Sequence, residues 1–154
     1  MEFDKVMRPQ IINLELDAKT KEEALDKLSD MLLKDEAIAS KDAYLKDVYL
    51  REKLGPTGIG NYIAIPHGKS ESVIKTSVAF AKLVNPIQWE TLDGEPVKLI
   101  FLFAVPAANE DNLHLQLLSQ LAAVLAYDES QEQLLNAKSA EEVLQIIVNR
   151  KTHV

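Results

Sequence analysis

The chain contains one apolar run with the composition of a buried strand, Val97-Lys-Leu-Ile-Phe-Leu-Phe-Ala-Val105. β-Branched and aromatic residues that follow one another almost without polar interruption are typical of a central strand covered on both faces. Shorter patterns with strand character lie N-terminal to it, at Gln10–Leu16, Tyr62–Ile65 and Ser77–Val84. We therefore predict a central β-sheet built from these segments.

Two helices with recognisable N-terminal caps are predicted between the first two strands. Thr20-Lys-Glu-Glu23 fits a capping box, and Ser40 can cap a second helix that Gly55-Pro56 would end. Apolar residues at helical spacing follow the caps: Leu25, Leu28, Leu32, Leu45, Val48 and Tyr49. Each helix therefore has an apolar side that can pack on the sheet.

The chain returns to a helical period after the apolar run. Asn112–Ala126 carries a leucine stripe, and Ser130-Gln-Glu-Gln133 and Ser139-Ala-Glu-Glu142 fit capping boxes for a short helix and a terminal helix. No repeat, low-complexity tract or long linker divides the sequence. We predict an α/β fold for residues 1–154, a single-domain sandwich with a central mixed β-sheet flanked by helices.

The composition limits the classes of function. A formal net charge of −7 argues against a nucleic-acid partner, because phosphates favour basic surfaces. Without cysteine the chain has no disulfide framework and no thiolate metal site. The acidic start Met1–Val6 does not resemble a secretory signal, and the longest apolar run, Leu99–Ala108, is far shorter than the ~20 residues of a membrane-spanning helix. We expect a cytoplasmic location.

A glycine-punctuated loop leads to the main candidate for chemistry, Gly55-Pro-Thr-Gly-Ile-Gly-Asn-Tyr-Ile-Ala-Ile-Pro-His-Gly68. Pro66 restricts its own φ, and we expect Gly68 to let the backbone turn sharply and to free space around the neighbouring ring. The imidazole of His67 should then lie at an exposed strand end. Because the chain lacks cysteine, His67 is the first candidate for a nucleophile near neutral pH.

The same loop does not fit a nucleotide site. Gly55-x-x-x-x-Gly60 has the outer glycines of a phosphate-binding loop, but Asn61-Tyr62 stands where Lys-Ser/Thr is required. Gly58-x-Gly60-x-x-Ile63 lacks the third glycine of a dinucleotide fingerprint. We predict no ATP site, no NAD site and no cofactor.

Two other residues are candidates for binding an anion beside His67. His114 falls in the first turn of a predicted helix, on its leucine stripe, and is either a hydrogen-bonded core residue or a neutral ring beside a phosphate or carboxylate. Arg51 falls in the last turn of the second helix and either solvates that helix end or directs its guanidinium at an anion held by His67. His153 lies in a polar tail and is assigned no role.

Metal and serine-hydrolase chemistry are not supported. Two imidazoles without a convincing carboxylate or thiolate partner fall short of the ligand set of a zinc site, so no metal is predicted. The chain also lacks the Gly-x-Ser-x-Gly elbow of a serine hydrolase.

Several motifs together resemble one protein family. Arg51-Glu52, Thr57-Gly-Ile-Gly60, Ile63-Ala-Ile-Pro-His-Gly68 and His114-Leu-Gln-Leu-Leu118 are similar to the fructose/mannitol-type enzyme IIA of the bacterial phosphoenolpyruvate-dependent sugar phosphotransferase system. Asp93-Gly-Glu-Pro-Val-Lys-Leu-Ile-Phe-Leu102 resembles the fructose branch of that family more than the mannitol branch. The resemblance spans nearly the whole chain and keeps the motifs in order.

The resemblance implies a relay of phosphoryl groups. His67 would accept phosphate from the phosphohistidine of HPr and pass it to a cognate enzyme IIB, for fructose or a related sugar. His114 and Arg51 match the second histidine and the arginine of the family's site, and the Thr57 hydroxyl could donate to a phosphate oxygen. A phosphohistidine donor needs no nucleotide or metal, and the membrane would be involved only through the sugar permease complex. One departure is Tyr62, where the family commonly has glycine.

Three alternatives remain open from the sequence. A nitrogen-regulatory enzyme IIA would use phosphorylation of the same histidine to govern binding to other proteins, without moving a sugar. A structural or protein-interaction domain would never be phosphorylated. A metal-dependent hydrolase would carry metal when purified.

Overall fold

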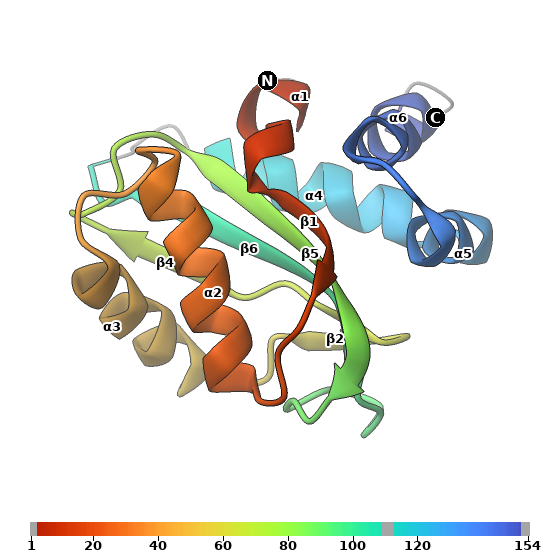
Figure 1. The fold of residues 1–154 in the computed structure, drawn as a ribbon, viewed down its shortest axis with the longest axis horizontal. Helices are drawn as coiled ribbons and strands as arrows, with labels where there is room; N and C mark the ends of the chain where they lie inside the picture. Colours follow the sequence, from red (N-terminus) through yellow and green to blue (C-terminus); the bar gives the residue numbers. More distant parts are fainter. Residues whose placement is uncertain (1–2, 109–112, 152–154) are drawn as a thin grey trace.

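The strand β6 (Val97–Pro106) runs through the middle of a mixed six-stranded sheet in the computed structural model, which describes residues 3–108 and 113–151 (Figure 1). The strands follow the order β1-β5-β6-β3-β2, and β4 also pairs with β6. The other strands are β1 (Ile12–Leu16), β2 (Gly58–Gly60), β3 (Ile63–Ala64), β4 (His67–Ser70) and β5 (Ser77–Ile87). The helices are α1 (Phe3–Val6), the 3₁₀ turn η1 (Pro9–Ile11), α2 (Lys21–Lys34), α3 (Lys41–Glu52), α4 (Leu113–Leu125), α5 (Asp128–Asn136) and α6 (Ala140–Lys151).

The predicted central strand is confirmed by the pairing of β6. It runs antiparallel to β5 and parallel to β3 and β4, and its residues are buried except for Lys98 and Pro106, which are half-buried. The strand β5 continues to Ile87, beyond the predicted Val84, because Ile87 pairs with Val97 at the start of β6. Pairing with a neighbouring strand has here outweighed the polar and proline residues that weaken the sequence pattern.

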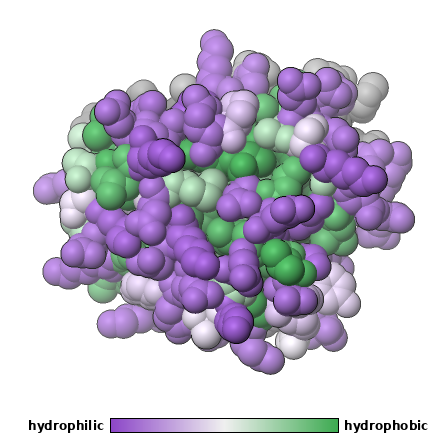
Figure 2. Space-filling model, in the orientation of Figure 1, coloured by the Kyte–Doolittle hydropathy of each residue, from purple (hydrophilic) through white to green (hydrophobic). Residues whose placement is uncertain are grey.

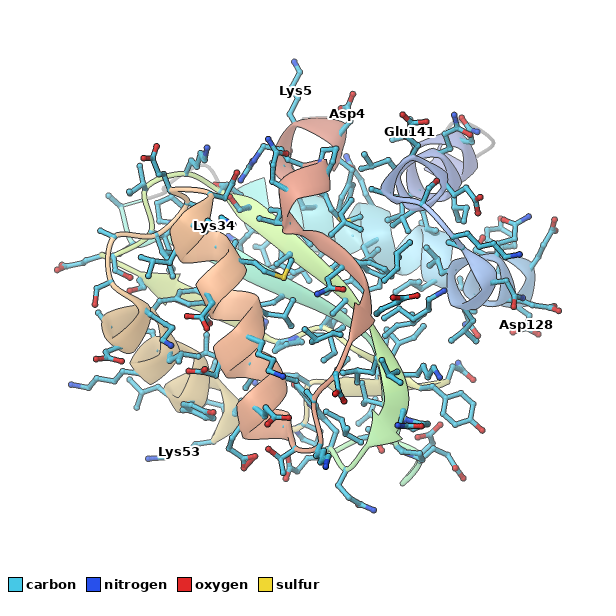
Figure 3. The ribbon with its side chains drawn as sticks, viewed as in Figure 1. Asp4, Lys5, Lys34, Lys53, Asp128 and Glu141 are labelled. Carbon is cyan, nitrogen blue, oxygen red and sulfur yellow. The ribbon has the colours of Figure 1, made fainter. Side chains whose placement is uncertain are left out.

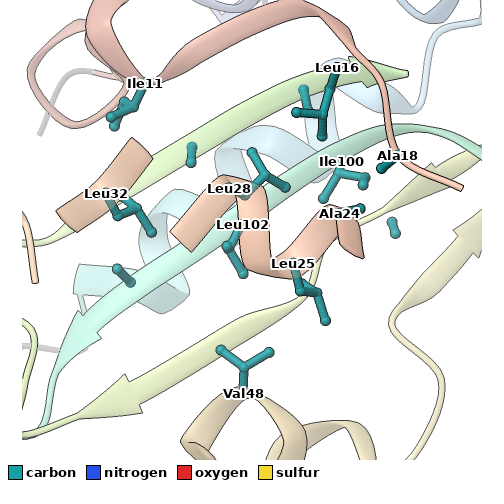
Figure 4. Close-up of a cluster of buried hydrophobic side chains, with 14 of the residues drawn as sticks. Ile11, Leu16, Ala18, Ala24, Leu25, Leu28, Leu32, Val48, Ile100 and Leu102 are labelled. Atoms are coloured by element: carbon teal, nitrogen blue, oxygen red, sulfur yellow. The ribbon is translucent and has the colours of Figure 1, made fainter. Parts of the chain in front are cut away.

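Each face of the sheet is covered by its own helices. Ile100 and Leu102 of β6 point into a core with α2 and α3, which Figure 4 shows at close range. Phe101 and Phe103 point into a second core with α1, α4, α5 and α6. This alternation follows from the two-residue period of a strand, and it confirms the predicted sandwich of helices around a mixed sheet.

Three of the predicted helix caps are confirmed. The side chains of Thr20, Ser40 and Ser139 accept hydrogen bonds from the backbone N–H groups three residues further on. In the first box the Glu23 carboxylate accepts from the N–H of Lys19, one residue before the cap. These caps satisfy N–H groups that would otherwise lack intrahelical partners.

The capping box predicted at Ser130 is wrong. The helix α5 already begins at Asp128, and Ser130 is buried within it. Asp128 and Glu129 occupy the first turn, where negative charge is favoured by the helix dipole, and this favours an earlier start.

The inner side of α3 also differs from the prediction. Tyr44 and Val48 are its fully buried residues, whereas Leu45 and Tyr49 are only partly buried. The Tyr44 hydroxyl donates to the backbone carbonyl of Phe103 at 2.7 Å, which connects α3 to the central strand. A buried tyrosine needs such a partner, and the sequence period alone does not supply it.

The sequence does not predict α1, η1, β2 or β4. The strand β4 consists of His67-Gly-Lys-Ser70, which has no apolar alternation, and it exists because it pairs in parallel with β6. Its position matters most for function, since it begins with the candidate nucleophile.

The outer surface is largely hydrophilic on the face that Figure 2 shows. Charged side chains such as Lys34 and Asp128 extend outward from helix ends (Figure 3). Among the helices of the described ranges, none combines the length and the apolar character needed to cross a membrane.

Candidate functional site

His67 is the first residue of β4, directly after Pro66. It pairs with Phe103 of β6, and the Phe103 N–H donates to the Pro66 carbonyl at 3.0 Å. The imidazole is half-buried. The prediction that His67 lies at the exposed end of the preceding strand is therefore wrong. His67 is the first residue of a separate strand, and its backbone is paired with β6.

Gly68 has a different role from the one predicted. Its φ is not positive, so it makes no sharp turn. A Cβ at this position would lie 2.7 Å from Cγ2 of Val48 and 3.0 Å from Cε1 of Tyr44, both on α3. Glycine is required here because α3 packs directly on β4, and a side chain would push the helix away.

This close packing brings Arg51 onto His67. The Arg51 Nε–H donates to Nε2 of His67 at 3.1 Å, and Nη1 donates to the backbone carbonyl of Gly55 at 3.4 Å. Of the two alternatives for Arg51, the structure thus shows the guanidinium on the histidine while it also contacts the loop after the helix. Its planar fork allows both contacts at once.

The two contacts of the His67 ring determine its tautomer. Nδ1 lies 3.3 Å from the carbonyl oxygen of Ile65, which can only accept, so the proton is assigned to Nδ1. Nε2 then carries a lone pair, and this lone pair accepts from Arg51. The nitrogen that faces the guanidinium is therefore the one that keeps its lone pair.

The surroundings keep the His67 ring neutral. Burial lowers its pKa below the ordinary value of 6.5, the hydrogen bond to Ile65 opposes this, and the charges of Arg51 and His114 lower the pKa further. A neutral ring retains the lone pair on Nε2 near neutral pH.

His114 lies at the start of α4 and is half-buried. Burial lowers its pKa, and the charge of Lys69 lowers it further. Its Nδ1 atom is buried without a hydrogen-bond partner among the described residues. The charge of His114 also lowers the pKa of His67.

The hydrogen-bond partners of Thr57 are Trp89 and Ile65. Only 2% of its surface is exposed, and its hydroxyl oxygen accepts from Nε1 of Trp89 at 3.0 Å. Its backbone carbonyl accepts from the N–H of Ile65 at 2.9 Å. Donation by this hydroxyl to a phosphate oxygen stays a prediction, and His153 lies outside the described residues.

Sequence reasoning did not identify Lys69, Trp89 or Lys21. Lys69 is exposed two residues after His67, on the same side of β4. Lys21 forms ion pairs at 2.5 Å with both Glu52 and Glu90 and lies 5.1 Å from the ring centre of Trp89. Trp89 is the single tryptophan of the chain, a signal that could have drawn attention to it.

Within the described ranges, no group of three or more histidine, cysteine, aspartate or glutamate side chains is arranged to hold a metal ion. The guanidinium of Arg51 donates to His67, and the charge of His114 lowers the pKa of His67. Such a set suits an anion beside a neutral nucleophile.

Comparison of the sequence with known proteins matches residues 5–150 to the family described as "Phosphoenolpyruvate-dependent sugar phosphotransferase system, EIIA 2". The chain is 35% identical over 147 residues to the PTS system fructose-specific EIIABC component of Bacillus subtilis, covering 96% of this chain and 23% of that protein. It is 37% identical over 138 residues to the PTS system fructose-specific EIIA component of Haloferax volcanii, covering 90% and 89%. The chain thus spans less than a quarter of the first relative and most of the second.

Solved structures show the same architecture. The nitrogen regulatory protein IIA-Ntr of Neisseria meningitidis superposes with a TM-score of 0.85 at 32% identity, covering 93% of this chain and 97% of that one. The enzyme IIA of the Escherichia coli complex between enzyme IIAMtl and phosphorylated enzyme IIBMtl superposes with a TM-score of 0.78 at 26% identity, covering 94% and 99%.

Proposed function

The chain belongs to the EIIA 2 family of the phosphoenolpyruvate-dependent sugar phosphotransferase system, and from this premise we propose that it accepts a phosphoryl group from the phosphohistidine of HPr on Nε2 of His67 and passes it to a cognate enzyme IIB. The observation that carries the proposal is the state of the His67 ring. The Nδ1–H group of the ring donates a hydrogen bond to the Ile65 carbonyl, and the lone pair on Nε2 accepts one from Arg51.

The transfer is a displacement at phosphorus. The N–P bond of the donor histidine breaks as a bond forms between Nε2 of His67 and phosphorus, and the Nδ1 proton stays in place. In the onward step the Nε2–P bond breaks while a deprotonated cysteine or a histidine of enzyme IIB bonds to phosphorus. The phosphohistidine donor already carries the phosphoryl-transfer potential, so the relay needs no nucleotide or metal to drive it.

Arg51 would change partners during the transfer. In the free protein its Nε–H donates to the lone pair of Nε2, so that donor must move to an equatorial phosphoryl oxygen as the N–P bond forms. Because the guanidinium is already at the nucleophile, little rearrangement is needed.

His114 would supply a second donor. The Nδ1 atom without a partner supports this role over that of a satisfied core histidine, since a buried ring nitrogen left unpaired is costly. Thr57 remains a candidate for a further donor, although its hydroxyl is buried and already accepts from Trp89.

The relatives support the proposed acceptor and sugar, and the location is part of the proposal. The complex of enzyme IIAMtl with phosphorylated enzyme IIBMtl supports an enzyme IIB as acceptor, and two relatives named fructose-specific support fructose or a related sugar. We place the chain in the cytoplasm as a single EIIA-type domain over residues 1–154, in contact with the membrane only through a sugar permease complex.

A nitrogen-regulatory function is the second candidate, because the Neisseria IIA-Ntr structure superposes with a TM-score of 0.85. In that case phosphorylation of His67 would control binding to other proteins. Rapid transfer from the phosphorylated chain to a purified enzyme IIB favours the transport function, and a stable phosphoprotein that binds regulatory targets favours the second.

The test is incubation with phosphoenolpyruvate, enzyme I and HPr, followed by intact-mass analysis before and after acid treatment. We expect the gain of one acid-labile phosphoryl group, lost in His67→Ala and retained in the control His153→Gln. Labelling that persists in His67→Ala would overturn the assignment, and the absence of labelling in the unaltered protein would refute the relay.

A further inference from the structure

We propose that Trp89 and Thr57 are positioning residues for His67: a buried chain of hydrogen bonds runs from the indole through Thr57 and Ile65 to the imidazole and sets its tautomer. The proposal rests on the proposed function, because the tautomer matters only if Nε2 is the atom that attacks phosphorus. Its central claim, which nitrogen of His67 carries the proton, concerns the free protein and can be tested there.

The first link joins the indole to the loop. Nε1 of Trp89 donates to Oγ1 of Thr57 at 3.0 Å, and only 7% and 2% of the two residues are exposed. A buried N–H without an acceptor is costly, so each partner restricts the other. Lys21, 5.1 Å from the indole ring centre and paired with Glu90, also restrains the tryptophan through a cation–π contact.

The second link fixes the backbone of the loop beside Trp89. The N–H of Gly58 donates to the Glu90 carbonyl, and the N–H of Leu92 donates to the Gly58 carbonyl, both at 3.1 Å. A Cβ on Gly58 would lie 2.2 Å from Cγ2 of Thr91, so no other residue fits this close approach. The loop at Thr57 therefore packs directly against the segment that follows Trp89.

The third link reaches the imidazole. The Thr57 carbonyl accepts from the N–H of Ile65 at 2.9 Å, and the Ile65 carbonyl accepts from Nδ1 of His67 at 3.3 Å. The Gly55 carbonyl of the same loop accepts from Arg51. The loop from Gly55 to Thr57 thus holds the nucleophile through one contact and the guanidinium through another.

A displaced Ile65 carbonyl would change the chemistry of the ring. Neutral histidine places its proton on the nitrogen whose hydrogen bond is better satisfied. If Nδ1 lost its acceptor, part of the population would carry the proton on Nε2, and that fraction could not attack phosphorus. Loss of one hydrogen bond of this kind corresponds to about a fivefold change in such an equilibrium.

The test uses variants that remove single atoms from the chain of contacts. Thr57→Val removes the hydroxyl and keeps the branched shape, and Trp89→Phe keeps an aromatic ring and removes the N–H. We would record the ¹⁵N chemical shifts of the His67 ring by NMR in the unphosphorylated protein and, separately, the initial rate of phosphorylation by phospho-HPr.

We expect both variants to raise the ratio of Nε2-protonated to Nδ1-protonated ring by about fivefold. Phosphorylation should slow in proportion to the Nδ1-protonated fraction that is lost, and therefore by less than fivefold. The double variant should be no slower than the more affected single variant, because both remove the same link. Thr57→Ser should restore the shifts and the rate. Ser139→Ala, which removes a hydroxyl that accepts from the Glu142 N–H at the start of α6, away from the chain of contacts, is the control and should leave both unchanged.

Two outcomes would overturn the proposal. Lower melting temperatures with unchanged ¹⁵N shifts would give Trp89 and Thr57 a merely structural role. Slower phosphorylation in Thr57→Val with unchanged shifts would instead favour direct donation from Thr57 to the phosphate. If the unaltered protein accepted no phosphate, the relay would fail, while the shifts would still decide whether the chain of contacts sets the tautomer.

Discussion

Nε of Arg51 lies 3.1 Å from Nε2 of His67, on the ring nitrogen whose lone pair is free of a proton. The contact joins the last turn of α3 to the first residue of β4, two elements that no local pattern places together. It holds a permanent positive charge against the nucleophile, and this arrangement leads to predictions for the rate, the pH dependence and the stability.

Arg51→Ala should slow phosphorylation of His67 about a hundredfold, since it removes a charged donor to the transferred group. Arg51→Lys should recover only part of the rate, because an ammonium lacks the planar fork. The pKa of His67 should rise in Arg51→Ala, since the guanidinium lowers it. Phosphorylation reactions quenched at successive times measure the rate, and NMR titration of the ring measures the pKa. Arg8→Ala, which breaks an ion pair with Asp35 elsewhere in the fold, is the control and should leave the rate unchanged.

Replacement of His114 by Gln should slow transfer with little change in melting temperature. Its ring is half-buried, and its Nδ1 contributes no hydrogen bond to the described residues, so the fold loses little. Thermal unfolding and phosphorylation rates, measured on the same preparation, separate the two effects. A large fall in melting temperature would instead identify His114 as a core histidine.

The lowered pKa of His67 makes a signed prediction for stability against pH. Between the ordinary value of 6.5 and the lower folded value, the unfolded chain binds a proton at this ring that the folded chain does not. The contribution of the neutral His67 ring to the free energy of unfolding is therefore fully present above pH 6.5. It is lost as the pH falls through the pKa that the ring has in the folded protein. Urea unfolding of the protein and of His67→Gln should show the unaltered protein losing stability relative to the variant in acid. A constant difference would show that the His67 pKa is the same in both states.

Gly68→Ala should destabilise the fold by about 1–3 kcal/mol, because the added methyl group would meet Val48 and Tyr44 of α3. Moving α3 away should also lengthen the contact between Arg51 and His67 and slow phosphorylation. Adding Val48→Ala makes room beside the new methyl group and should recover part of the rate. An unchanged melting temperature in Gly68→Ala would contradict the proposed close packing.

Tyr62→Gly should stabilise the protein. Tyr62 has a φ of 68°, in the left-handed region where a side chain costs about 1 kcal/mol, and the residue is 44% exposed. Glycine removes this strain, and the melting temperature should rise by about 2–4 °C for a chain of this size. The same backbone conformation explains why glycine suits this position. A lower melting temperature in the variant would mean that the tyrosine ring makes packing contacts that outweigh the strain.

Local sequence patterns predict much of the architecture. The apolar run of β6, and the caps at Thr20, Ser40 and Ser139, were predictable because burial of a continuous run and a hydrogen bond three residues along the chain depend on neighbouring residues alone. His67 could be singled out for a similar reason, since its neighbours Pro66 and Gly68 and the absence of cysteine are visible in the sequence.

The site itself depends on contacts between distant parts of the chain. Pairing with Phe103 turns His67 into the first residue of a strand, and the packing of Val48 on Gly68 brings Arg51 to its ring. Trp89 reaches Thr57 across 32 positions of sequence. No local period encodes such distances, because a hydrogen bond or a tight packing contact is set by where whole elements lie in the sheet. The sequence by itself therefore determined the central strand, three helix caps and His67 as the candidate nucleophile. Only the tertiary structure decided that Nε2 of His67 keeps its lone pair, because the acceptor for Nδ1 and the donor to Nε2 are placed by the packing of whole elements.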